Sequence, residues 1–272
     1  MSKTVIDTKE HSRIVELYNS GFSQAELETM YGVSHGVIKR ILIRYQVELR
    51  DHSHKRRSYS INENYFDVID TPNKAYILGF LYADGCNATD IRLVKLCLQE
   101  RDAYIIEQVR NEIESSHPIR VRHLHHTNTN HQDAYEIAIV NKHMSDTLSN
   151  LGVVKAKSLI LTFPTWLHPS LVSHFIRGYF DGDGHIRMHG SYIEISGTEK
   201  FCRGLASVCS ERDIKSNIRK LSSKSGLVWS FYICNKKDAL AFLEFIYHDA
   251  EMCLIRKREV YQRLYEKYAC TA

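Results

Sequence analysis

The sequence of 272 residues predicts an α+β fold made of two similar halves, preceded by a small all-helical domain. The first reason is a repeated segment, ILGFLYADG at Ile77–Gly85 and IRGYFDGDG at Ile176–Gly184, in which an apolar run has glycine at its third position and closes with Asp-Gly. The second is that each copy is followed by the same order of strand-like and helix-like segments, which indicates an internal duplication. The third is a stretch near the N-terminus whose apolar residues have helical spacing.

Composition is that of an ordinary globular protein, with 43% hydrophobic and 25% charged residues. A net charge of +4 permits a nucleic-acid partner without requiring one. The 7 cysteines include no C-x-x-C pair, so neither a disulfide framework nor a zinc ribbon is predicted. With no signal peptide and no apolar run of membrane-spanning length, we expect a soluble intracellular protein, in the cytoplasm of a bacterial or phage host or in an organelle.

Residues 1–50 are predicted to form a helix-turn-helix domain. The first helix covers Glu10–Asn19, a capping box at Ser23-Gln-Ala-Glu26 begins the second, and Ser34 is expected to cap the third. The segment resembles the small helix-turn-helix domains of resolvases and transposases, whose third helix enters the major groove of DNA. The resemblance implies DNA contacts by Ser34, His35, Lys39 and Arg40; the alternative is a helical docking or dimerisation module.

The segment Asp51–Asn64 is polar and basic, and we predict a linker there. It either follows the phosphate backbone of DNA or is a solvated spacer. Beyond it we expect a first repeat at 65–154, a connection at 155–171 and a second repeat at 172–272.

Each repeat is expected to begin with its motif helix and to continue in the order αββαββα. In the first repeat the following elements are a strand at Ile91–Leu98, a helix at Glu100–Ser115, strands at Ile119–His125 and Tyr135–Val140, and a helix at Lys142–Leu151. In the second they are strands at His185–Met188 and Tyr192–Ser196, a helix at Glu199–Glu211, strands at Ile214–Leu221 and Val228–Cys234, and helices at Lys237–Tyr247 and Ala250–Tyr268.

The two motif helices are expected to pack side by side, because glycine at Gly79 and Gly178 allows another backbone to approach closely. Gly85 and Gly184 are expected to take the left-handed position that ends a helix.

The acidic residues of the motifs, Asp84 and Asp183, fall in the last turn of these helices and stand 99 positions apart in the chain. A carboxylate there faces the negative end of the helix dipole, which costs about 0.3–1 kcal/mol, so two of them at matching places indicate that something positive lies nearby. Two like charges brought together must take up a proton or gain a cation, and a divalent metal with oxygen ligands is the natural cation.

Both segments resemble the LAGLIDADG motif of homing endonucleases, and FIRGYFDGDGHIR at Phe175–Arg187 is close to the usual motif sequence of that family. The resemblance spans Tyr65 to Tyr268 and is to the two-motif, single-chain type, for which we expect a monomer. It implies two halves related by a pseudo-twofold axis, with a saddle-shaped antiparallel sheet from each half over the DNA. It also implies cleavage of both strands of a long DNA target site with Mg²⁺ or Mn²⁺, leaving 3′ overhangs.

The resemblance assigns the metal ligands: the carboxylates of Asp84 and Asp183 and the peptide oxygens just before them, at Ala83 and Gly182. The family also has polar residues that position water or stabilise charge, and the resemblance assigns this role to Gln99, Lys142 and Lys237. Lys236 is an alternative to Lys237.

Basic residues recur on or beside the predicted strands, where a two-stranded ribbon could enter the major groove. The alternative is that these charges simply face water. The set comprises Arg92, Lys95, Arg120, Arg122, Arg187, His189, Lys215 and Arg219.

Departures from the motif leave other functions open. Tyr82 replaces an acidic residue that the second motif keeps as Asp181, at a position that is usually not a metal ligand in the family. A run of histidines at His123, His125 and His126 has no cysteine at zinc-site spacing and is interpreted as a polar hairpin. The alternatives to an endonuclease are a DNA-binding regulator that has lost cleavage and an RNA maturase that aids the splicing of intron RNA.

Overall fold

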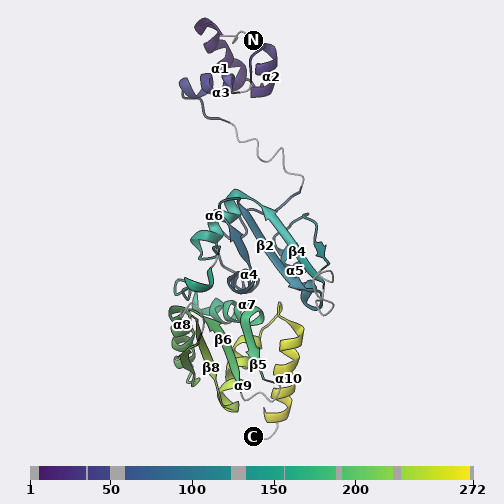
Figure 1. The fold of residues 1–272 in the computed structure, drawn as a ribbon, viewed down its shortest axis with the longest axis vertical. Helices are drawn as coiled ribbons and strands as arrows, with labels where there is room; N and C mark the ends of the chain where they lie inside the picture. The colour runs from purple at the N-terminus through teal and green to yellow at the C-terminus, as the bar shows by residue number, and fades with distance from the viewer. Residues whose placement is uncertain are drawn as a thin grey trace. The chain divides into compact units, whose positions relative to one another are not determined.

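The computed structural model describes residues 6–34, 36–49, 59–123, 133–155, 157–187, 192–222 and 228–269. The chain divides into two compact units, 1–58 and 59–272, each of which is considered by itself (Figure 1). None of the described helices is long and apolar enough to cross a membrane.

The predicted linker at 51–64 extends too far. Ser60 donates its backbone N–H to Ser116 Oγ at 2.7 Å, and Asn62 donates to the carbonyl of Ile113 at 2.9 Å. Residues 59–64 therefore belong to the second unit, because their backbone groups pair with the segment that follows a helix there. Residues 51–58 lie outside the described part of the chain.

The first unit is a three-helix domain with its own small core. Ile14, Leu27 and Ile38, one from each helix, are fully buried in it. Its elements are the 3-10 turn η1 (Thr8–Glu10) and the helices α1 (His11–Asn19), α2 (Gln24–Met30) and α3 (Val37–Arg44).

Of the two helix caps predicted for this unit, one is confirmed and the other is wrong. The predicted capping box is confirmed, because Ser23 Oγ accepts from the Glu26 N–H at 3.2 Å and Glu26 Oε2 accepts from the Ser23 N–H at 2.7 Å. The predicted cap by Ser34 is wrong. Helix α3 begins after Gly36, whose φ is +87°, and Glu28 Oε1 accepts the Gly36 N–H at 2.7 Å.

The second unit contains two repeats of helices and strands. The first repeat has α4 (Pro72–Ala83), β1 (Cys86–Ala88), β2 (Leu93–Gln99), η3 (Glu100–Asp102), α5 (Ala103–Glu112), β3 (Arg120–Arg122), β4 (Ala134–Val140) and α6 (Lys142–Asn150). The turns η4 (Lys157–Leu159) and η5 (Pro169–Leu171) lie in the connection. The second repeat has α7 (Val172–Asp183), β5 (Gly184–Ile186), β6 (Ile193–Gly197), α8 (Glu199–Ser210), β7 (Asn217–Lys220), β8 (Trp229–Ile233), α9 (Lys236–Tyr247) and α10 (Ile255–Ala269).

Each repeat forms a four-stranded antiparallel sheet, and the strand order is the same in both: β1-β2-β4-β3 and β5-β6-β8-β7. Helices α5 and α6 pack on the first sheet and α8 packs on the second. Buried residues alternate with more exposed ones along β2 and β6, so one face of each sheet packs on the core and the other is more exposed. The predicted α+β duplication is confirmed by this shared topology. A continuous apolar core joins the two repeats.

Two element boundaries differ from the prediction. The first strand-like segment is preceded by a separate short strand, β1, which pairs with β2 through Cys86 and Lys95. Three residues are too few to show a two-residue period, which is why the sequence did not reveal β1. The last helix begins at Ile255 and not at Ala250, because Met252, Cys253 and Leu254 form a buried segment before it.

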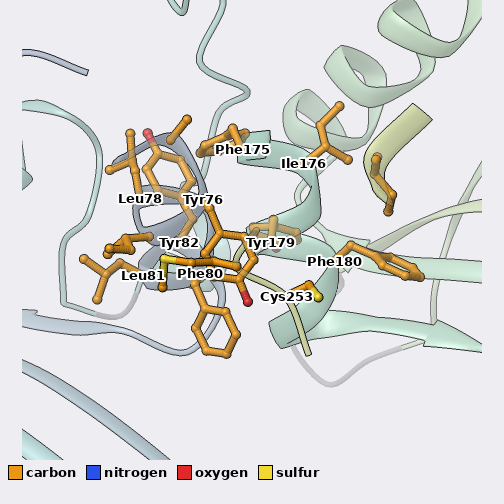
Figure 2. Close-up of a cluster of buried hydrophobic side chains, with 14 of the residues drawn as sticks. Tyr76, Leu78, Phe80, Leu81, Tyr82, Phe175, Ile176, Tyr179, Phe180 and Cys253 are labelled. Carbon is orange, nitrogen blue, oxygen red and sulfur yellow. The ribbon is translucent and has the colours of Figure 1, made fainter. Parts of the chain in front are cut away.

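Helices α4 and α7 cross where each has its early glycine. A Cβ added to Gly79 would lie 2.0 Å from the Phe175 carbonyl oxygen, and one added to Gly178 would lie 2.0 Å from the Tyr76 carbonyl oxygen. The two contacts are reciprocal, as expected of elements related by a twofold axis. Figure 2 shows the aromatic side chains around this crossing, among them Tyr179 of α7.

Glycine is required at the last position of each motif, but for a different reason from the predicted one. Gly184 has extended backbone, with φ −80° and ψ 149°, and Gly85 is absent from the described glycines with positive φ. Space is what requires them: a Cβ would lie 2.6 Å from the Leu81 carbonyl oxygen at Gly85 and 2.1 Å from Phe180 Cδ2 at Gly184. The predicted left-handed helix ends are therefore wrong.

Candidate active site

The two motif aspartates emerge at neighbouring ends of α4 and α7. Asp84 is the residue that caps α4, and Asp183 is the last residue of α7. A Cβ placed on Gly182 would lie 3.1 Å from Asp84 Oδ2, so the carboxylate of the first motif lies against the backbone that carries the second. Both aspartates keep accessible surface, although their carboxyl groups are partly withdrawn from bulk water.

The two carboxyl groups influence each other. The pKa of Asp84 is raised to about 6, first because its carboxyl is withdrawn from bulk water and then because the negative charge of Asp183 is close. The pKa of Asp183 is also raised by desolvation, although the positive charge of Lys157 and a hydrogen bond from Tyr179 oppose that shift. Bringing the two acids together therefore favours a proton or a cation between them.

Two buried lysines stand at the carboxyl ends of the motif helices. Lys157 is 8% exposed and donates from Nζ to the Gly85 carbonyl. Lys257 is 6% exposed and donates from Nζ to the carbonyls of Phe180 at 2.5 Å, Asp181 at 2.8 Å and Gly184 at 2.6 Å. A cation at the negative end of a helix dipole is favourable, so these lysines offset part of the cost of the carboxylates there.

The lysines and the aspartates are electrostatically coupled. Burial lowers the pKa of Lys257 to about 8, and the charges of Asp181, Asp84 and Asp183 oppose that shift. Burial likewise lowers the pKa of Lys157, against the attraction of Asp183 and Asp84. The site thus holds two acids and two ammonium groups in one partly dehydrated place.

Lys257 is positioned by contacts that reach across both repeats. Arg256 donates from Nη2 to Asp102 Oδ2 at 3.0 Å and from Nε to Asp102 Oδ1 at 3.1 Å. The backbone N–H of Ile255 donates to the Tyr104 hydroxyl at 2.7 Å. Because Asp102 and Tyr104 belong to the first repeat, they fix the start of α10 over the junction of the two repeats.

Asp181, the other acid of the second motif, points into the core. Its carboxylate is fully buried and accepts from the hydroxyls of Tyr76 at 3.0 Å and Tyr247 at 2.5 Å and from the backbone N–H of Leu254 at 2.6 Å. Its counterpart in the first motif, Tyr82, donates its hydroxyl to the Leu151 carbonyl. Asp181 therefore joins α7 to the segment before α10.

The donor set at the paired aspartates suits a divalent cation with hard oxygen ligands. Two carboxylates of raised pKa meet there, and the peptide oxygens of Ala83 and Gly182 directly precede them in the chain. Among the residues that the structure describes, no group of three or more His, Cys, Asp or Glu side chains is placed to hold a metal.

The other predicted catalytic residues lie on the surface. Lys142 begins α6 and contacts Asp146 Oδ2 at 2.5 Å, and Lys237 is exposed in the first turn of α9. The lysines that act on the pKa of Asp84 are Lys257 and Lys157 instead. Gln99 ends β2 and is exposed, and its role stays a prediction.

Sequence reasoning missed Lys157 and Lys257, although the sequence carries a signal for them. Lys157 follows Asp84 by 73 positions, and Lys257 follows Asp183 by 74. Aligning the chain on the two aspartates would have placed Lys157, in the connection after the first repeat, and Lys257, in the second repeat, at nearly the same distance from them. Neither lysine lies in a motif, so only the duplication links them.

The predicted DNA-contacting residues come from three parts of the chain: the two repeats and the first unit. In the first repeat Lys95, Arg120 and Arg122 lie in β2 and β3, and Arg92 is exposed just before β2. In the second repeat the exposed residues are Arg187, Lys215 and Arg219. In the first unit Ser34, Lys39 and Arg40 are exposed at α3. His35 and His189 lie outside the described residues.

The comparison with protein families identifies one repeat. Residues 170–247 match the family described as LAGLIDADG-like domain, which covers most of the second repeat. The resemblance predicted from the motifs is thereby confirmed for this segment. No curated protein matches the chain in sequence.

The chain is similar to several solved structures at low sequence identity. Full-length DUF199/WhiA from Thermatoga maritima has 18% identity and a TM-score of 0.47, and the match covers 76% of this chain and 64% of that one. The meganuclease I-SmaMI bound to uncleaveable DNA has 11% identity and a TM-score of 0.48, covering 72% and 88%. I-DmoI in complex with DNA and Ca has 13% identity and a TM-score of 0.48, covering 74% and 99%. This chain therefore spans less than two thirds of the WhiA chain.

Proposed function

We propose that the chain, whose residues 170–247 match the LAGLIDADG-like domain family, is a site-specific double-strand DNA endonuclease of the homing type. The observation that carries the proposal is the meeting of Asp84 and Asp183 at the adjacent ends of α4 and α7. One acid comes from each of two repeats of the same topology, so each repeat can act on one strand of a duplex. Cleavage of both strands with 3′ overhangs is the outcome that the family resemblance implies.

In this proposal Asp84 and Asp183 hold Mg²⁺ or Mn²⁺ together with the peptide oxygens of Ala83 and Gly182. The bound ion supplies an activated water and stabilises the oxygens that attack and leave the phosphorus. The chain itself contributes the ammonium groups of Lys157 and Lys257, which are held close to the acids by backbone carbonyls. They stabilise the negative charge that grows on the phosphate in the transition state.

DNA binding in this proposal uses the sheet faces that are turned away from the helices, where basic residues of both repeats are exposed. The helix-turn-helix unit adds affinity because it is linked to the second unit. Once the second unit is bound, the weak binding of the helix-turn-helix unit to the same DNA becomes an intramolecular step.

The test is selection and cleavage of a randomised duplex library by the full chain. We expect one long sequence to be bound, and cut on both strands when Mg²⁺ is present but not in EDTA. The ends, read by sequencing, should carry 3′ overhangs. If the protein binds one sequence but does not cut it in Mg²⁺ or Mn²⁺, the proposed nuclease activity is contradicted.

A second candidate is a sequence-specific DNA-binding protein that does not cut. It is favoured by the two lysines, because two buried ammonium groups offset part of the negative charge of the two carboxylates. The same library separates the candidates, since a binding protein selects a sequence and leaves it intact.

A further inference from the structure

The exposed face of the second sheet carries an arginine that its neighbours hold in one orientation. Arg219 of β7 donates from Nη2 to Glu194 Oε1 at 2.9 Å and to the Tyr192 hydroxyl at 2.9 Å. Its guanidinium lies over the ring of Tyr232, 4.9 Å from the centroid. The side chain is nevertheless 50% exposed, so it is held in place without being covered.

The neighbours of Arg219 are themselves fixed. Glu194 of β6 lies directly opposite Tyr232 of β8 and accepts from Ser230 Oγ at 2.5 Å. Tyr192 and Tyr232 stack with centroids 6.1 Å apart, and Arg187 lies over Tyr192 at 4.6 Å. The cluster is therefore built on three adjacent strands of a rigid sheet, on the face opposite the one that packs on α8.

The charge of this cluster is unsuited to a simple phosphate contact. Desolvation opposes the ionisation of Glu194, but hydrogen bonds from Ser230 and Arg219 outweigh it, so its pKa lies below the ordinary value and it is negative at neutral pH. A fixed carboxylate repels phosphate oxygens and cancels much of the positive charge of Arg219. By contrast, Lys215 stands exposed just before β7 and brings a flexible ammonium group, the kind that suits a phosphate.

The orientation of Arg219 suits a base edge. Its contacts with Glu194 and Tyr192 use Nη2, and the guanidinium carries further N–H donors on Nε and Nη1. Because Nη2 gives its N–H groups to Glu194 and Tyr192, Nη1 is the free donor at the end of the guanidinium, and O6 and N7 of guanine are the acceptors that such a donor meets in the major groove. Holding it in place beforehand lowers the entropy lost on binding.

The face that carries the cluster is continuous with the proposed cleavage site. Strand β5 begins at Gly184, immediately after Asp183, and its His185 lies directly opposite Glu194. A duplex lying on this face would thus pass from the paired aspartates to the cluster.

We propose that Arg219, held by Glu194 and stacked on Tyr232, reads one guanine of the target duplex, while Lys215 contacts the phosphate backbone. The proposal rests on the proposed DNA-binding function and adds the base that this part of the protein recognises. Glu194 acts as a positioning residue for Arg219.

The experiment is a binding selection from a randomised duplex library in EDTA, where cleavage plays no part, with the full-length wild type, Arg219→Lys, Glu194→Gln and Lys215→Gln. For Arg219→Lys we expect the preference for guanine at one position of the selected site to fall about tenfold or more, with other positions unchanged. For Glu194→Gln we expect a weaker preference at the same position, because the arginine is released. For Lys215→Gln we expect unchanged preferences and a salt dependence of binding that is smaller by about one phosphate contact.

The outcomes separate this inference from the proposed function. If the wild type selects no sequence, DNA recognition itself fails and the inference fails with it. If the wild type selects a defined sequence but Arg219→Lys and Glu194→Gln keep every base preference, only the assignment of Arg219 is overturned. A further variant, Arg219→Gln, removes the charge; if it kept every base preference and lowered the salt dependence as Lys215→Gln does, Arg219 would be a phosphate contact and the inference would also be overturned.

Discussion

Lys157 and Lys257 place positive charge where two helix dipoles and two carboxylates concentrate negative charge. Each lysine is buried, and each donates to carbonyl oxygens at the carboxyl end of a motif helix. Removing a lysine would leave Asp84 and Asp183 with less compensating charge and would remove a positive group from the approaching phosphate.

Replacing either buried lysine should therefore abolish most cleavage. We expect Lys157→Met and Lys257→Met to lower the cleavage rate about 100-fold or more, as the loss of one preorganised charged donor does in other enzymes. Lys142→Met and Lys237→Met are the matched controls, because both lysines are exposed. Single-turnover cleavage of the selected duplex gives the rates. If the two surface lysines prove essential and the two buried ones do not, the assignment from the family resemblance is right and the present one is wrong.

Asp84 should give the metal-free protein a pH-dependent stability. Its pKa is about 6 in the folded chain, against about 3.9 in an unfolded one, so folding favours the protonated form. Its contribution to stability is therefore full below about pH 4 and is lost as the pH rises through about 6. Asp84→Asn should flatten this dependence and, because the residue is open to solvent, raise the unfolding free energy at pH 8 by about 1 kcal/mol at most.

Chemical denaturation of the wild type and the variant in EDTA between about pH 4 and 8 measures this effect. Asp146→Asn, at an exposed carboxylate paired with Lys142, is the control and should leave the pH dependence of the wild type unchanged. An Asp84→Asn curve parallel to that of the wild type would contradict the raised pKa.

For individual residues, the sequence predicted the two motif aspartates but not the buried lysines that lie near them. Asp84 and Asp183 stand in repeated motifs, and the position of a carboxylate at a helix end already indicated a nearby positive group. The identity of that group depended on where the turn at 157 and the start of α10 return to the motif helices. Local sequence does not encode such long-range contacts.

Helices α4 and α7 form the element that sets the distance between the acids. Their crossing depends on backbone contact at Gly79 and Gly178, where a side chain would meet a carbonyl oxygen of the other helix. A rigid backbone cannot yield as a flexible side chain does, so neither glycine can be replaced without moving the helices apart.

Gly79→Ala should destabilise the second unit although alanine is the better helix former. The gain in helix propensity is about 1 kcal/mol, whereas a Cβ 2.0 Å from the Phe175 oxygen forces the helices to separate, for which we expect a net loss of about 3 kcal/mol. Gly197→Ala is the control, because its Cβ would lie 3.1 Å from a side-chain atom of Phe201. Thermal or chemical unfolding measures both. A Gly79→Ala variant as stable as Gly197→Ala would show that α4 and α7 are not in close contact.

Helices and strands with a clear apolar periodicity were predicted from the sequence, whereas elements that depend on strand pairing or on contacts with distant residues were missed. The motif helices and β4 have strong apolar patterns, and they were located to within a few residues. Strand β1 exists because Cys86 pairs with Lys95 on β2, and the start of α10 is set by contacts of Leu254 and Arg256 with distant residues. Pairing and docking of this kind leave no mark on local sequence.

As a whole molecule, the protein joins a duplicated unit to a separate three-helix unit. One acid from each repeat meets at the junction of the repeats, together with Lys157 of the connection and Lys257 of the second repeat. The first unit has its own core of residues from all three helices. In the proposed function we expect it to add affinity, because it is linked to a second DNA-binding unit.

Deleting residues 1–58 should weaken DNA binding and leave the cut position unchanged. The deletion ends at the boundary between the two units, so the second unit keeps the backbone contacts of residues 59–64. We expect at least about a tenfold loss of affinity, because the linked binding event is lost. Titration of the selected duplex gives the affinity, and sequencing of the cut ends gives the position. A truncated protein that cuts elsewhere would mean that the first unit selects the site of cleavage.

The central claim, that Asp84 and Asp183 act together on the two strands, is tested most directly by strand-resolved cleavage of the selected duplex in Mg²⁺. The wild type, Asp84→Asn and Asp183→Asn are compared, with affinity measured in parallel. We predict that the wild type cuts both strands and that each variant binds the duplex but loses the cut on at least one strand, with the double variant inert. Variants that bind and still cut both strands at the wild-type rate would contradict the claim.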